Sequence, residues 1–202
     1  MVHTKKAAGF TLIEVLVSIV IVGIIAIALM SLNASNAERS KREQFQSNVE
    51  SILSFLRTAR TNAITNAEIN GSTPDGFGVY IKKAEDNKSI DITLFADIDD
   101  GTGNGNGDNK YDAGADTVID SKSITSINWQ LALENPNPNS ISLDKTLTVI
   151  FTPPDAEMVI NDNTTDNDLV SVEITGTYKS TVKRICLNRI SEFFEILTGE
   201  SC

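Results

Sequence analysis

The sequence predicts an α+β protein in which a long N-terminal helix, transmembrane in its first half, packs on a C-terminal antiparallel β head. Three observations predict it. A charge-free apolar run extends from Val15 to Leu32, a polar stretch of helical periodicity follows, and short alternating runs between turn residues lie beyond Gly71. With 41% hydrophobic residues, the 202-residue chain is too apolar to be a disordered acidic one despite its net charge of −10.

The apolar run is long enough to cross a bilayer. The stretch from Phe10 to Leu32 spans about 34 Å as a helix, against a hydrocarbon core of about 30 Å. Lys5 and Lys6 precede the run, so the positive-inside rule places the N-terminus in the cytoplasm and the rest of the chain outside. A removable secretory signal would have a shorter apolar region and a small-residue cleavage site, which residues 33–37 lack. An ordinary membrane anchor remains an alternative.

One acidic residue, Glu14, lies at the start of this apolar helix. A carboxylate inside a membrane span costs about 2.5–3.5 kcal/mol at the centre and less near an edge. No Lys or Arg occurs between Phe10 and Glu38. The cation that balances Glu14 must therefore come from elsewhere.

The segment from Lys5 to Val15, KKAAGFTLIEV, resembles the class III signal of type IV pilins and type II secretion pseudopilins. The resemblance implies that a prepilin peptidase cleaves between Gly9 and Phe10 and methylates the new amino group of Phe10. It also implies that Glu14 of one subunit neutralises this amino group on a neighbouring subunit. The implied partners are other pilin or pseudopilin subunits, the prepilin peptidase, a membrane platform protein and the membrane itself.

Cleavage after Gly9 would leave 193 residues with a net charge of −12 and would remove His3, the only histidine. A chain without histidine cannot form a Ser-His-Asp triad or a His-ligated zinc site, and two cysteines cannot form a Cys-based zinc site. We therefore expect no enzymatic activity and no required cofactor. The strongly acidic charge also disfavours binding to nucleic acid through a basic face.

The polar stretch after Leu32 is predicted to continue the same helix to about Asn66, because it contains no Pro before Pro74 and no Gly between Gly23 and Gly71. Apolar residues recur there at intervals of three and four and predict one buried stripe. Its members are Phe45, Val49, Ile52, Leu56, Ala59 and Ala63. The end of the stretch, with Ala59-Arg60 and Ala63-Ile64, is similar to the ARxxAI segment of GspH/FimT-type minor pilins. We expect Arg60 to cap the helix or to pair with the head.

Beyond Gly71, short alternating runs predict strands, and the connections are too short for βαβ crossovers, so antiparallel sheets are expected. Two small sheets stacked on the helix would accommodate them. The predicted strands are residues 77–82, 90–96, 117–119, 127–133, 146–151, 158–160, 169–175, 182–187 and 193–197. The predicted organisation is a leader of residues 1–9, a transmembrane or filament-core helix of 10–32, an amphipathic continuation of 33–70 and a β-rich head of 71–202.

An acidic insert follows the second predicted strand, and its alternating oxygen donors and glycines can wrap a hard cation such as Ca²⁺. Four donors fall at positions 1, 3, 5 and 9 of an EF-hand-like loop, but Asn109 replaces the turn glycine and Ala115 the bidentate Glu. The alternative is a solvated turn without metal. The candidate ligands are Asn104, Asn106, Asp108 and Asp112, with Asp97 and Asp99 as further donors.

The two cysteines, Cys186 and Cys202, fall in the part of the chain that the topology places in an oxidising compartment. Many pilins close a C-terminal loop with a disulfide, and the resemblance implies one here. It would enclose 15 residues and stabilise the fold by about 3 kcal/mol. Two free thiols are the alternative.

The resemblance implies a structural subunit, a minor pilin or pseudopilin, that leaves the membrane for an extracellular or periplasmic filament. A major pilin is one alternative. Another is a tip pilin whose head binds DNA or a surface, for which Lys179, Lys183 and Arg184 form the basic cluster near the C-terminus.

Overall fold

The computed structural model describes residues 11–84, 89–98, 109–125, 130–134, 146–161, 170–191 and 193–199, with the backbone alone for 31–35, 130–134 and 193. The chain divides into two compact units, Met1–Glu43 and Gln44–Cys202. The first unit holds the apolar part of the long helix. The second holds the rest of that helix and the strands.

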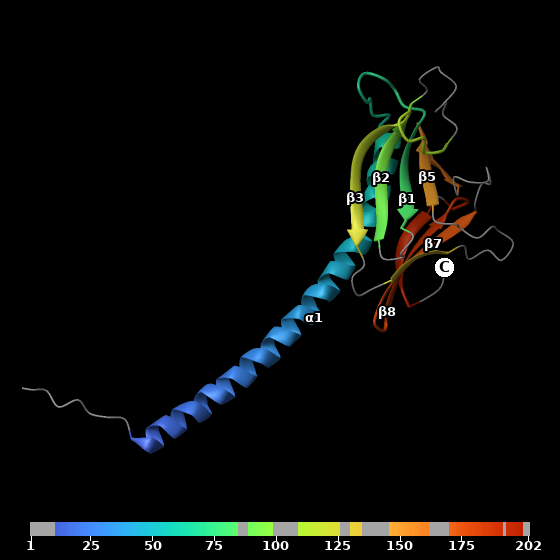
Figure 1. The fold of residues 1–202 in the computed structure, drawn as a ribbon. Helices are drawn as coiled ribbons and strands as arrows, with labels where there is room; N and C mark the ends of the chain where they lie inside the picture. The colour runs from blue at the N-terminus through green and yellow to red at the C-terminus, as the bar shows by residue number, and fades with distance from the viewer. Residues whose placement is uncertain are drawn as a thin grey trace, which may run out of the picture. The chain divides into compact units, whose positions relative to one another are not determined.

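The helix α1 extends from Leu12 to Ile64, which confirms the expected continuous helix (Figure 1). It ends in a Schellman motif, where the Ala67 N–H donates to the Asn62 carbonyl and the Asn66 N–H to the Ala63 carbonyl. Asn66 adopts a positive φ of 48°, which asparagine tolerates better than most residues. The helix therefore ends within two residues of Asn66, the end expected from the sequence, and before residue 70, where the amphipathic segment was expected to end.

Five strands form the larger sheet, in the order β3-β2-β1-β5-β6, and every neighbouring pair is antiparallel. The hairpin of β1 and β2 lies at its centre, and β5 pairs on the free side of β1. The strand β3 is longer than the sequence predicted, since it continues past Ile119 to Thr125. The bounds are β1 Gly76–Lys83, β2 Ser89–Asp97, β3 Thr117–Thr125, β5 Thr146–Thr152 and β6 Glu157–Asn161.

Four strands form the second sheet, in the order β4-β7-β8-β9, also antiparallel throughout. Two antiparallel sheets were expected, and the described strands match the predicted ones to within a few residues. Residues 127–129 and 169 of the predicted strands lie outside the described residues. The bounds are β4 Gln130–Glu134, β7 Ser171–Tyr178, β8 Thr181–Asn188 and β9 Phe193–Thr198.

One hydrophobic core joins the second part of α1 to both sheets (Figure 1). Phe45 on α1 lies 6.0 Å from Tyr178 on β7, measured between ring centroids, and Phe151 on β5 lies 6.1 Å from Phe194 on β9. The predicted helix stripe is confirmed. Its six members are 0–4% exposed: Phe45, Val49, Ile52, Leu56, Ala59 and Ala63.

Part of the opposite face of the larger sheet is also covered. Phe95 on β2 and Ile150 on β5 are fully buried but do not belong to the main core. Both are cross-strand partners of Gly78 on β1, and a Cβ atom there would clash with the Phe95 ring and lie 2.8 Å from Ile150 Cγ1. Gly78 is therefore the residue that admits the Phe95 ring over the sheet.

Gly78→Ala should destabilise the fold by about 1–3 kcal/mol, because the added methyl group overpacks a site with buried neighbours on both sides. Thermal unfolding of the full chain in detergent, followed by circular dichroism, measures the loss. Gly23→Ala is the matched control, since nothing lies within 4 Å of its Cβ position in α1. Equal melting of Gly78→Ala and the wild type would contradict this account of the glycine.

Candidate functional site

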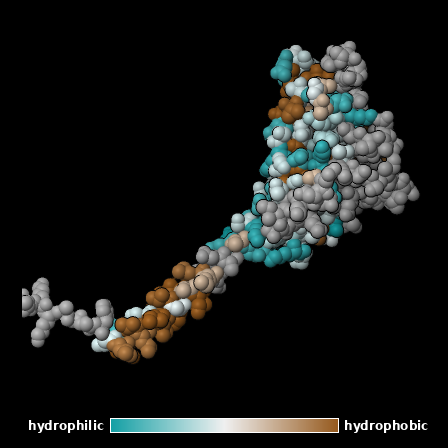
Figure 2. Space-filling model, in the orientation of Figure 1, coloured by the Kyte–Doolittle hydropathy of each residue, from teal (hydrophilic) through white to brown (hydrophobic). Residues whose placement is uncertain are grey.

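The N-terminal part of α1 presents an apolar surface on all sides. Leu12–Met30 is long and apolar enough to cross a membrane, and every side chain from residue 11 to 30 is exposed. Figure 2 shows this segment in brown, while polar residues alternate with apolar ones further along the helix. A helix that is hydrophobic all round needs a bilayer or other helices to cover it.

Glu14 lies in the first turn of this helix, where the structure places it three residues after the N-cap Thr11. The Glu14 N–H donates to Thr11 Oγ1 at 3.3 Å and to the Thr11 carbonyl oxygen at 3.1 Å. Thr11 is an N-cap residue at this site that the sequence analysis missed. The Thr-x-x-Glu spacing of a capping box was the signal that could have revealed it.

No cation balances Glu14 within the described part of the chain. The next basic residue along α1 is Arg39, 25 residues and about 37 Å further on. The N-terminal end of a helix favours a negative charge, which offsets part of the cost of placing a carboxylate there. The arrangement can therefore bind a positively charged group presented beside the first turn of α1, in apolar surroundings.

Residues 4–30 match the family model of the prokaryotic N-terminal methylation motif. The N-terminus is of the type IV pilin kind. No curated protein and no solved structure matched the chain. The motif implies processing by a prepilin peptidase and assembly with other pilin-like subunits, and the apolar helix followed by antiparallel sheets is a pilin-like arrangement.

The processing residues themselves lie outside the described residues, although the motif covers them. These are Lys5, Lys6, Gly9 and Phe10. The cleavage position and the methylation of Phe10 stay predictions. The GspH/FimT likeness also stays a prediction.

Arg60 lies near the end of α1 and contacts the head, as expected. Its partner is an aromatic ring. Its guanidinium carbon lies 5.9 Å from the ring centroid of Phe194 on β9. A cation over an aromatic face contributes about 0.5–1 kcal/mol at a partly exposed site. Arg60 thus links the helix to the second sheet.

The candidate calcium ligands are only partly described. Asn104, Asn106, Asp108 and Asp99 lie outside the described residues. Asp97 ends β2 and is 1% exposed, and Asp112 donates its N–H to Asp116 Oδ2 at 2.7 Å. The described residues contain no group of three or more His, Cys, Asp or Glu that could hold a metal ion. Calcium binding stays a prediction.

Only one of the two cysteines of the predicted disulfide lies within the described residues. Cys186 on β8 is 8% exposed and is not a free thiol. Cys202 lies outside the described residues. The pairing of the two cysteines stays a prediction.

The described end of the acidic insert, residues 109–116, packs over the outer face of the larger sheet. The Tyr111 ring stacks on Tyr80 with centroids 4.6 Å apart and lies 5.0 Å from Phe95. On the β6 side, Asn161 Nδ2 donates to the Asn109 carbonyl. Burial, and secondarily the nearby Tyr111, raises the pKa of Tyr80 above its ordinary value of 10.0.

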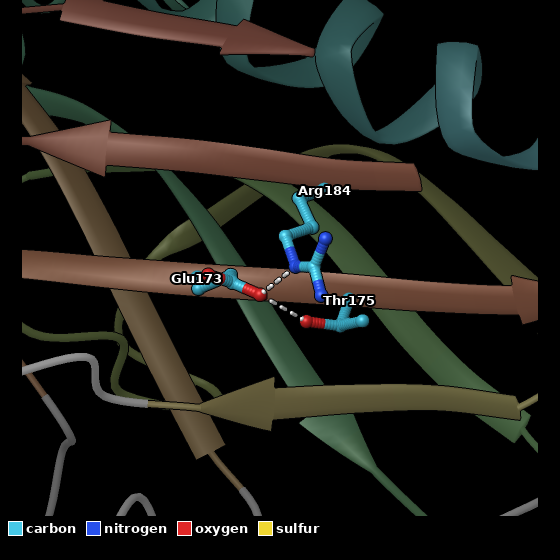
Figure 3. Close-up of polar contacts among 3 residues, drawn as sticks. All are labelled: Glu173, Thr175 and Arg184. Carbon is cyan, nitrogen blue, oxygen red and sulfur yellow. Dashed lines mark hydrogen bonds and ion pairs between the residues drawn. The ribbon is translucent and has the colours of Figure 1, made fainter. Parts of the chain in front are cut away.

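The three residues of the basic cluster near the C-terminus have separate contacts. Arg184 Nε binds Glu173 Oε1 at 2.6 Å, and the Thr175 hydroxyl donates to the same oxygen at 2.7 Å (Figure 3). Lys183 donates to Thr198 Oγ1, and Lys179 lies over the Tyr178 ring. Each of the three cations contacts a different neighbour.

Stability should fall above pH 10 partly because of Tyr80. The unfolded chain loses the tyrosine proton near the ordinary pKa, while the folded chain retains it to a higher pH. The stabilising contribution is complete below pH 10 and is lost as the pH rises through the raised pKa. Urea unfolding at pH 9 and pH 11 should show a smaller alkaline loss in Tyr80→Phe than in the wild type. An identical loss in both proteins would contradict the assignment.

Arg184→Met should destabilise the protein by about 3 kcal/mol, because it leaves the Glu173 carboxylate, 8% exposed, without its guanidinium. Adding Glu173→Gln to Arg184→Met should recover part of the loss. Denaturant unfolding of the two single variants and the double variant measures the coupling. As the control, Arg39→Met breaks the exposed Arg39–Glu43 pair on α1 and should cost less than about 1 kcal/mol. Equal costs for Arg184→Met and Arg39→Met would count against a special role for the buried pair.

Proposed function

We propose that this chain is a structural subunit, a minor pilin or pseudopilin, of a type IV pilus or type II secretion pseudopilus. A prepilin peptidase processes it after Gly9, and the mature subunit then leaves the membrane by packing its apolar helix among those of its neighbours. The observation that carries the proposal is Glu14 at the start of a fully exposed apolar helix within a match to the methylation motif.

The chemistry of assembly follows from this placement. Cleavage creates an α-amino group on Phe10, and N-methylation leaves it positively charged. Two unit charges about 4 Å apart attract several times more strongly in an apolar surrounding than in water. Leaving one of them buried and unpaired costs about 3–5 kcal/mol. The pair would thus set the register between subunits, while the apolar helices supply most of the packing energy.

Two observations favour a structural subunit over a DNA-binding tip pilin. The net charge of the mature chain would be −12, and the three cations of the C-terminal basic cluster contact three different partners. A salt-dependent DNA mobility shift by the mature protein would favour the tip pilin instead. A high copy number in shed filaments, measured by mass spectrometry, would favour a major pilin.

Glu14→Val should be inserted and processed normally but incorporated into shed filaments at least about tenfold less than the wild type, because the neighbouring amino group is left unpaired. Quantitative mass spectrometry of the filament and membrane fractions measures incorporation and shows whether the mature chain begins at Phe10. Glu43→Val, an acid on the same helix beyond the apolar segment, is the control and should assemble normally.

Normal filaments from Glu14→Val would show that the carboxylate is dispensable. A secreted chain that begins at any residue other than Phe10 would overturn the filament assignment itself.

A further inference from the structure

Two exposed basic residues follow the apolar part of α1. Lys41 and Arg42 have solvent-exposed side chains and no hydrogen-bond or ion-pair partner among the described residues. Their neighbour Arg39 differs, because its Nε binds Glu43 Oε1 at 2.8 Å. Lys41 and Arg42 thus offer two positive charges outside any ion pair of the described residues, about one helical turn before the second unit begins, with Glu38 as the preceding acid on the helix.

The second unit carries the opposite charge. Residues 44–202 contain 24 Asp and Glu against 12 Lys and Arg, a formal charge of −12. Among its described residues, four cations are exposed (Arg57, Lys82, Lys122 and Lys179). Seven acids are exposed (Glu50, Glu68, Asp75, Asp91, Asp120, Asp155 and Glu157). A second such head is therefore a complementary partner for the pair Lys41 and Arg42.

The spacing along the helix brings Lys41 level with the start of the neighbour's second unit. If Glu14 neutralises the Phe10 amine of a neighbour, parallel helices are offset by four residues, about 6 Å. Phe45, the first fully buried residue of α1, lies four residues after Lys41. The same offset places Phe45, at the start of one subunit's second unit, level with Lys41 of the next subunit.

We propose that Lys41 and Arg42 form an assembly contact with the acidic head of the adjacent pilin-type subunit. The proposal rests on the proposed function, because it uses the offset that the Phe10–Glu14 pair would impose. The contact adds a second electrostatic constraint on register, at the outer end of the apolar segment, and is accessible to salt, unlike a pair buried among apolar helices.

A membrane surface suits these cations less well. Lys41 lies nine residues after Leu32, about 13 Å beyond the last apolar residue of the span. The polar headgroup layer adds only about 5–8 Å on each side of the hydrocarbon core. The two cations thus lie beyond the headgroups, where a neighbouring head would be found.

The test is charge reversal in the full chain, Lys41→Glu with Arg42→Glu. This variant should reach the membrane and be processed at Phe10 like the wild type, yet enter shed filaments at least about tenfold less, since like charges then face each other. Arg57→Glu with Lys82→Glu is the matched control. It makes the same change in net charge at two other exposed positions and should assemble normally. Lys41→Arg with Arg42→Lys keeps the charge and should also assemble.

Salt gives a second readout. The fraction of subunits released from filaments is measured as the NaCl concentration is raised. This fraction should change less with salt for Lys41→Gln with Arg42→Gln than for the wild type, because the variant lacks the two charges that salt screens.

Normal incorporation of the charge-reversed variant would overturn the proposal, as would equal loss in the matched control. A fall in its membrane level before assembly would point to lipid headgroups instead and would also overturn it. If the chain is not a filament subunit at all, the result is different, because the wild-type chain itself would then be absent from filaments.

Discussion

A carboxylate at the start of a wholly apolar helix is the constraint on which the rest of this protein depends. The side chains from residue 11 to 30 have no cover of their own, so the segment is stable only in a bilayer or among similar helices. Glu14 distinguishes the bilayer from a bundle of helices, because the described part of the chain supplies no cation near it. An environment that brings a positive charge beside the first turn is favoured over one that does not. The helix is therefore suited to exchange lipid for neighbouring subunits.

The second part of the same helix packs against the two sheets. From Phe45 onward only one stripe is apolar, and it is buried against both sheets in a single core. The Schellman motif at Asn66 then ends the helix and satisfies its last carbonyl groups. The contact of Arg60 with Phe194 and the packing of Phe45 against Tyr178 connect the helix to the second sheet at two points. This second part is thereby fixed to the head by side-chain packing.

Part of the outer face of the larger sheet is also buried, although antiparallel sheets often leave one face to solvent. Gly78 lets the Phe95 ring lie over β1, and Tyr111 from the acidic insert stacks on Phe95 and Tyr80. The described end of the insert is therefore part of the packed structure. Tyr111 and the hydrogen bond from Asn161 to the Asn109 carbonyl hold this described end against the sheet.

The sequence by itself determined the features that depend on local pattern. The length of the apolar run, the unbroken helix, the buried stripe from Phe45 to Ala63 and the antiparallel strands all follow from composition and from periods of 3.6 and 2. The acid at Glu14 and the leader-like segment before it were also visible there. Only the tertiary structure decided which strands share a sheet, that Tyr111 covers Phe95, and that Glu173 pairs with Arg184. These contacts join residues far apart in the chain, or residues whose faces depend on strand register, and no local periodicity encodes them.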